Sequence, residues 1–191
     1  MFGFNLEKTI QATAVLLERE PAQRTNYMRL VKLLYIADRE SLKERAKPIC
    51  GSQAYAMERG PVLGTVLDLI KGRDPDSERW SEFIRKDHYC VELVKRPGNF
   101  QLSRSEIKKL QEVSDRYQDS DEWDMVVICH QLPEFVKNDP MKTTQKVRPI
   151  PLDDILEAVD RLRDKADIIR DANEDIGFSR FFGDHVPTVV E

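Results

Sequence analysis

The segment from Leu30 to Ala37 constrains the fold more than any other part of the chain. Seven of its eight residues are apolar, and Lys32 is the only charged side chain among them. Neither glycine nor proline interrupts it, so the segment is well suited to a helix. A helix that is apolar nearly all round must be packed on most sides by other elements. We therefore predict a central buried helix over residues 27–44, with the rest of the chain packed around it.

The composition indicates a soluble globular protein rich in amphipathic helices. Of the 191 residues, 40% are hydrophobic and 34% are charged, and the formal net charge is −4, which does not favour binding to nucleic acid or to an anionic membrane. No apolar run approaches the roughly 20 residues of a membrane span, and the N-terminus lacks a signal-peptide pattern. Three widely spaced cysteines do not suggest a disulfide framework. We expect a cytoplasmic protein.

The first half of the chain predicts helices with a small β element. Asn5 is expected to cap a helix that runs to about residue 19, and Thr25 or Asn26 to cap the central helix. Residues 54–61 form an extended run, after which Pro61 takes the first position of another helix. Residues 83–95 alternate apolar and polar side chains and predict one half-buried strand of a small antiparallel hairpin or meander.

The second half predicts further helices and a tail. Ser103 and Glu106 form a capping box that opens a helix, and another helix begins near residue 120. Residues 134–150 are interpreted as an extended connector, followed by one helix from about 151 to 172. We predict a mainly α (α+β) domain over residues 1–172 and a tail over 173–191 that is either partner-binding or disordered. The tail carries three phenylalanines, Phe178, Phe181 and Phe182.

Motifs for enzyme chemistry are missing from the sequence. There is no glycine-rich phosphate loop, nucleophile elbow or dinucleotide fingerprint. The three histidines lie more than forty residues apart, and none has a second histidine or a cysteine at metal-ligand spacing. We interpret His130 as a buried or half-buried helix histidine that makes one hydrogen bond. The sequence predicts no catalytic residues, no metal and no cofactor, and therefore a protein that is not an enzyme.

Several motifs in the correct order resemble one known family. They are Leu33-Leu-Tyr-Ile-Ala-Asp-Arg-Glu40, Lys47-Pro-Ile49, Tyr55-Ala-Met-Glu-Arg-Gly-Pro-Val62 and Leu102-Ser-Arg-Ser-Glu-Ile107, followed by Trp123 and by His130 before Leu132-Pro133. This pattern resembles the SocA-like Panacea domain over roughly residues 6–160. Phe135 stands near a position where the pattern has tryptophan, and the segment after about residue 172 has no counterpart.

The resemblance implies a mainly helical domain that acts as an antitoxin. Such a protein binds and neutralises a cognate toxin encoded next to it, and the family is also associated with phage-linked proteins. At least one member resembles an adaptor that hands its toxin to a host protease, so a protease is a second expected partner. The family has no associated catalytic residues.

We assign a candidate partner-binding surface to Tyr35, Asp38, Tyr55, Glu58 and Arg59, because aromatic and arginine side chains dominate interface energetics. The structural alternative is that Asp38 accepts hydrogen bonds from the turn at Gly60 while both tyrosines pack with their hydroxyls outward. Phe181 and Phe182 of the tail are further candidates, since they either fold back on the domain or dock on a partner.

Three other functions stay open at this point. The main alternative is a phage or mobile-element protein that binds a host protein and has no toxin partner. A hydrolase that uses Asp38 or His130 is favoured only if these two side chains share a solvent-open pocket. A DNA-binding regulator is disfavoured by the acidic balance and by the lack of a basic recognition helix. The sequence does not reveal the toxin's identity or the oligomeric state.

Overall fold

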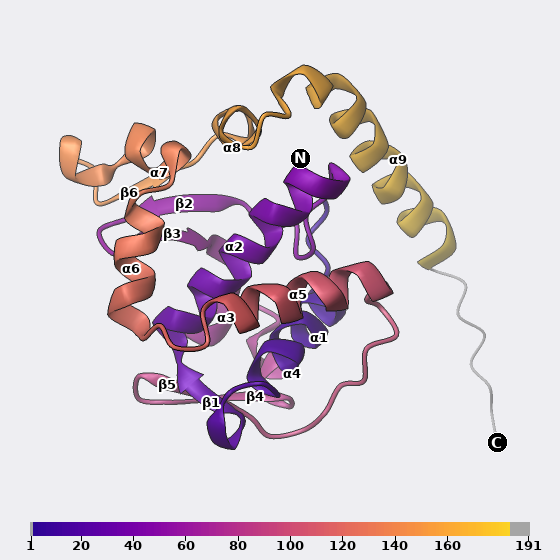
Figure 1. The fold of residues 1–191 in the computed structure, drawn as a ribbon. Helices are drawn as coiled ribbons and strands as arrows, with labels where there is room; N and C mark the ends of the chain where they lie inside the picture. Colours follow the sequence, from indigo (N-terminus) through magenta and orange to yellow (C-terminus); the bar gives the residue numbers. More distant parts are fainter. Residues whose placement is uncertain (1, 184–191) are drawn as a thin grey trace.

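The computed structural model describes residues 2–183, with side chains described through residue 174. In this part of the chain, nine α-helices accompany two small three-stranded antiparallel sheets. This confirms the predicted mainly helical α+β class. Helix α2 passes through the middle of the molecule, and the other elements surround it (Figure 1). Among the described helices, none is long and apolar enough to cross a membrane.

The first two helices begin at capping asparagines. Helix α1 (Leu6–Leu17) follows Asn5, and helix α2 (Tyr27–Arg45) follows Asn26; each asparagine accepts a hydrogen bond from a backbone N–H of its helix at 2.9 Å. Such caps satisfy N–H groups that have no partner inside the helix. Every residue of α2 from Met28 to Asp38 is buried, as the apolar segment predicts for a helix packed on all sides.

A hairpin follows α2 and forms the first sheet. Strands β2 (Ala54–Met57) and β3 (Gly60–Leu63) pair with each other, and β6 (Val147–Pro149) pairs with the other side of β2. The prediction that Pro61 begins a helix is wrong, because Pro61 lies inside β3. A strand at the edge of a sheet tolerates proline because its missing N–H is not needed there. The next helix, α3 (Gly64–Ile70), starts directly after β3.

The second sheet lies at the start of α2. Its strand order is β1 (Arg24–Asn26), β5 (Cys90–Leu93) and β4 (Ile84–Asp87), and the short helix α4 (Ser77–Ser81) precedes β4. The sequence predicts one strand where the structure has a hairpin of two. The turn between β4 and β5 contains His88 in the left-handed region, with φ of 52°. Because β1 leads straight into α2, this sheet fixes where the central helix enters the core.

Two capping boxes start the helices that cover α2. Helix α5 (Arg104–Arg116) begins after Ser103, whose hydroxyl and the Glu106 carboxylate bond to each other's backbone N–H groups. This confirms the predicted capping box. Helix α6 (Glu122–His130) begins in the same way after Asp121. Both helices pack against α2, so the core forms between these three elements, α1 and the hairpin of the first sheet.

The C-terminal third differs from the prediction. Residues 134–150 are not a plain connector, since they include most of helix α7 (Pro133–Asn138), a 3-10 turn and β6. The single helix predicted to follow is broken into α8 (Leu152–Ala158) and α9 (Lys165–Gly183). Asp160 lies between them in the left-handed region with φ of 60°. The segment predicted as a tail is thus helical up to the end of α9, which runs along the outside of the domain (Figure 1).

Candidate partner-binding site

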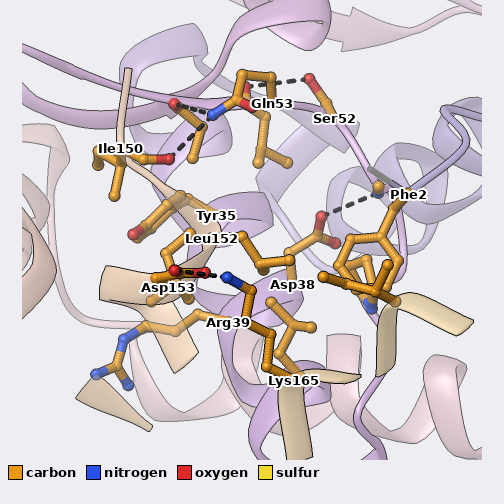
Figure 2. Close-up of a pocket in the computed structure, with 17 residues that line it drawn as sticks. Phe2, Tyr35, Asp38, Arg39, Ser52, Gln53, Ile150, Leu152, Asp153 and Lys165 are labelled. Atoms are coloured by element: carbon orange, nitrogen blue, oxygen red, sulfur yellow. Dashed lines mark hydrogen bonds and ion pairs between the residues drawn. The ribbon is translucent and has the colours of Figure 1, made fainter. Parts of the chain in front are cut away.

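The first candidate site is a cavity of about 330 Å³ between α2, the segment before β2 and the C-terminal helices. Tyr35, Asp38 and Arg39 line it from α2, as Figure 2 shows. The cavity is also lined by the Lys165 ammonium of α9, which lies 2.7 Å from the Asp153 carboxylate of α8. The cavity is therefore enclosed partly by an ion pair that joins the two last helices.

Asp38 organises the turn that follows α2. Its carboxylate accepts hydrogen bonds from the backbone N–H groups of Ile49 (3.0 Å), Cys50 (2.8 Å) and Gly51 (3.2 Å). The structural alternative expected these hydrogen bonds to come from the turn at Gly60. That expectation is wrong about the donors, which belong to residues 49–51. Burial outweighs these three donors and raises the pKa of Asp38 from 3.8 to about 6.

Glu134 connects α7 to α2 through two side chains. Its fully buried carboxylate accepts a hydrogen bond from the Tyr35 hydroxyl at 3.0 Å and from Arg39 Nε at 2.6 Å. Arg39 Nη2 adds a longer bond of 3.3 Å to the second carboxylate oxygen. Burial is the main cause that raises the pKa of Tyr35, and the nearby Glu134 charge adds to it. The Tyr35 hydroxyl therefore stays neutral and points into the protein rather than outward.

The polar atoms around this cavity thus serve the fold. Asp38, Glu134 and Arg39 are bonded to backbone groups or to each other, and Tyr35 is 1% exposed. Among the side chains described through residue 174, no group of three or more histidines, cysteines or carboxylates is placed to hold a metal ion. The hydrolase alternative required Asp38 and His130 to share a solvent-open pocket. Asp38 lines this cavity and His130 does not.

A second candidate site is a groove of about 770 Å³ beside the turn that joins β2 and β3. Its walls come from the N-terminal half of α2, from that turn, from α3 and from the segment before β6. The turn contributes Glu58 and Arg59, which are both exposed, and Met57 at the end of β2 is half-buried. Two of the predicted residues therefore line a larger and more open site than the cavity that contains Tyr35 and Asp38.

Lys32 lies at the floor of the groove. Its ammonium donates a hydrogen bond to the Pro61 carbonyl oxygen at 2.7 Å, and the side chain is 1% exposed. Burial lowers its pKa from 10.5 to about 8. Gly60 passes directly over it with φ of 94°, and a Cβ there would lie 3.1 Å from Lys32 Nζ and 3.2 Å from His130 Cδ2. A glycine is therefore required at this point of the turn.

His130 closes the other side of this turn from the end of α6. Its ring stacks on Phe135 with centroids 4.6 Å apart, and it makes one hydrogen bond with the Glu58 backbone. Burial and the positive charge of Lys32 lower its pKa, while Nε2 has no hydrogen-bond partner within the described part of the chain. The prediction of a half-buried helix histidine with one hydrogen bond matches this geometry.

An exposed apolar face of α6 adjoins the groove. Trp123 and Val127 are one helical turn apart, and they are 54% and 59% exposed. The Arg59 guanidinium lies 5.2 Å from the centre of the Trp123 ring, a cation–π distance. Through Arg59, the α6 face and the groove form one continuous surface.

Residues 30–134 match the family model described as antitoxin SocA-like, Panacea domain. The match covers more than half of the 191 residues. The chain belongs to this family. Neither the curated proteins nor the solved structures gave a significant match. The matched region of the Panacea domain contains most of the buried part of α2, the β2–β3 hairpin and α6, and it ends at Glu134.

The Panacea domain does not bring its predicted site residues together. Tyr35 and Asp38 lie at the cavity, whereas Glu58 and Arg59 line the groove. Tyr55 lines neither space, because its ring packs against Gly64, where an added Cβ would approach it to 2.6 Å. The side chains of Phe178, Phe181 and Phe182 lie outside the described residues. Of the predicted residues that are described, Tyr35 and Asp38 are buried and structural, Glu58 and Arg59 are exposed, and Tyr55 packs against Gly64.

Three residues at these two sites were not among the site residues predicted from the sequence. Glu134 directly follows a proline, and nothing local shows that it pairs with α2. Trp123 was noted only as part of the family pattern, although an exposed tryptophan on an acidic helix start is a recognisable surface signal. Lys32 was visible as the single charge within an apolar segment, and a lone buried cation usually has a dedicated partner.

Proposed function

We propose that this Panacea domain acts in the cytoplasm as an antitoxin that binds a toxin protein directly and so neutralises it. The match of residues 30–134 to the antitoxin family carries the proposal. The internal pairing of Asp38, Arg39 and Glu134 supports it, because these groups stabilise the fold and are not free to act on a substrate. Recognition then falls to exposed side chains.

The exposed face formed by Trp123, Val127 and Arg59 is the contact surface that we assign to the toxin. Tryptophan and arginine are the side chains most often found at interface hot spots. A solvent-exposed tryptophan next to an exposed valine leaves apolar surface in water, and burying it against a partner is favourable. Arg59 holds its guanidinium near the Trp123 ring, so part of this surface is ordered before binding.

A co-expression rescue experiment tests this function. Each open reading frame that flanks the gene is expressed alone and then together with this protein, and growth and co-purification are followed. The expected result is a neighbour that stops growth alone, is tolerated with this protein and co-purifies with it. If no neighbour is toxic and none binds, the antitoxin function is excluded for this chain. Pull-downs from the host then test the alternative of a host-protein ligand.

Delivery of the toxin to a host protease is a finer form of the same proposal. Simple neutralisation leaves the toxin bound and stable, whereas delivery shortens its lifetime. Pulse-chase measurement of the toxin, with and without this protein, separates the two mechanisms. A toxin half-life that is unchanged while growth is rescued supports neutralisation by binding alone.

A further inference from the structure

The groove beside the β2–β3 turn is cationic in a chain that is acidic overall. Its lining contains Lys32, Arg59, Lys71 and Lys146, and Glu58 is the only carboxylate among its lining residues. The formal net charge of the whole chain is −4. Positive charge is therefore gathered locally, and low-dielectric walls strengthen its field on a ligand inside the groove.

The same groove carries apolar and flexible side chains. Met28, Met57 and Met141 line it, and Met141 is 72% exposed. Val147 at the start of β6 is 45% exposed and extends the apolar wall. Methionine adapts its unbranched side chain to irregular partners and is common at surfaces that accept varied peptides. A ligand that meets this lining must bring apolar side chains as well as negative charge.

We propose that this groove receives a peptide segment of the partner toxin that combines acidic with apolar side chains. The inference rests on the proposed function for the identity of the partner, and it adds the site and the chemistry of the bound segment. Carboxylates of the segment pair with Arg59, Lys71 and Lys146 at the rim. Its apolar side chains cover the methionines. The phosphates of a nucleic acid could pair with the cations, but its polar backbone would give the methionines no apolar partner. A peptide is therefore the better occupant.

Lys32 contributes a fixed charge beneath this segment. Its ammonium is held by the Pro61 carbonyl oxygen at 2.7 Å and is screened little by water, because the side chain is 1% exposed. A carboxylate that enters the groove above the Gly60 backbone approaches this charge without having to reorganise it. Attraction of this kind favours acidic segments over neutral ones of the same shape.

The first test reverses charge at the groove in the complete protein. The double variant Lys71→Glu/Lys146→Glu is compared with Arg104→Glu/Lys86→Glu, in which both positions are exposed and neither lines the groove. The two variants change net charge equally. In the rescue assay with the toxic neighbour, we expect the groove variant to lose rescue and the control to keep it. Circular dichroism and thermal unfolding verify that both variants fold.

The second test does not depend on the toxin. A labelled synthetic peptide of alternating leucine, phenylalanine and glutamate is titrated with the wild-type protein, and fluorescence anisotropy reports binding. The same peptide with lysine in place of glutamate and a single-stranded oligonucleotide are titrated in parallel. We expect the acidic peptide to bind at least tenfold more tightly than the lysine peptide. The groove variant and a second variant, Met141→Ser, should each weaken its binding.

The outcomes distinguish a failure of the groove proposal from a failure of the proposed antitoxin function. Rescue that survives charge reversal, with wild-type rescue intact, overturns the groove proposal and leaves the antitoxin function standing. Acidic-peptide binding that is lost with the groove variant supports the groove even if no neighbour is toxic, in which case only the antitoxin function fails. Preferential binding of the oligonucleotide, or equal binding of both peptides, overturns the groove proposal.

Discussion

The hydroxyl of Tyr35 donates a hydrogen bond to Oε1 of Glu134 at 3.0 Å, although 99 positions of sequence separate the two residues. The bond joins the middle of α2 to the first turn of α7, and it is buried at both ends. Arg39 completes the arrangement by neutralising the same carboxylate. A buried carboxylate requires such partners, because an unpaired charge in the interior is costly. The chain thus fixes α7 on α2 at one polar point inside an apolar core.

Tyr35→Phe should lower the free energy of unfolding by about 1–3 kcal/mol, because Glu134 loses one of its donors while Arg39 stays in place. Urea denaturation of wild type and variant measures the difference. Tyr89→Phe is the matched control, since Tyr89 is 71% exposed. Its free energy of unfolding should stay within about 0.5 kcal/mol of wild type. Equal effects of the two substitutions would contradict a structural role for the Tyr35 hydroxyl.

Because of Asp38, the free energy of unfolding should depend on pH between about pH 4 and pH 7. The pKa of its buried carboxyl is about 6 in the folded state, against an ordinary value of 3.8. Since the pKa in the folded state is the higher one, the contribution of the Asp38 carboxyl to the free energy of unfolding is fully present below pH 3.8. It is lost as the pH rises through about 6. The loss amounts to about 3 kcal/mol. Asp38→Asn cannot ionise, so its free energy of unfolding lacks this component.

The measurement for Asp38 is the difference between wild type and Asp38→Asn at pH 4 and at pH 7, from urea denaturation at each pH. Wild type should lose stability relative to the variant as the pH rises. A difference that stays constant between these two pH values would show that the Asp38 carboxyl is ionised throughout, with its three N–H donors outweighing burial.

Because of Lys32, the free energy of unfolding should rise with pH in the alkaline range, opposite to the effect of Asp38. Its folded pKa of about 8 lies below the ordinary 10.5, so its contribution is present above pH 10.5 and is lost as pH falls through about 8. The expected change is about 3 kcal/mol. Comparing wild type with Lys32→Met at pH 7 and pH 10 isolates it, because burial lowers the pKa of His130 and raises that of Cys129 to about 11, so both neighbours stay largely neutral over this range. No change in the difference would argue for an ammonium that is well solvated.

Gly60→Ala should destabilise the domain more than Gly72→Ala. Both glycines have positive φ, 94° and 66° respectively, so both substitutions strain the backbone. Only at Gly60 does the added methyl meet Lys32 and His130, whereas at Gly72 no atom of the described residues lies within 4 Å of the added Cβ. We expect the free energy of unfolding to fall by about 1 kcal/mol for Gly72→Ala and by at least about 2 kcal/mol for Gly60→Ala. Thermal unfolding of the two variants gives the comparison, and equal losses would show that Lys32 and His130 move aside freely.

The parts of the fold that the sequence predicts well depend on local patterns. The apolar run of α2, the cap at Asn26 and the Ser103–Glu106 capping box each involve residues within a few positions of one another. Pro61 was placed incorrectly because proline suits both the first turn of a helix and an edge strand, and only pairing with β2 decides between them. The break at Asp160 carries no glycine or proline signal at all.

The candidate site was harder to predict because it depends on distant contacts. Asp38 and Tyr35 look like surface groups in a linear sequence, since core packing does not require an acid there. Their burial follows from the turn at residues 49–51 and from Glu134, whose positions depend on the complete fold. Arg59 was predicted to belong to a partner-binding surface, but its partner Trp123 lies 64 positions later. Sequence spacing therefore identifies candidates and leaves their grouping to the tertiary structure.

Trp123→Ser combined with Val127→Ser should separate stability from function. Both side chains are more than half exposed, so the free energy of unfolding should fall by no more than about 1 kcal/mol. Toxin neutralisation in the rescue assay should nevertheless be lost, because removing an interface tryptophan commonly costs 2 kcal/mol or more of binding, roughly a 30-fold weaker complex. Phe100→Ser is the control, since Phe100 is 78% exposed and lies in the loop before α5. If Phe100→Ser abolishes rescue and the α6 variant keeps it, the toxin contacts a surface that includes Phe100 and not the exposed face of α6.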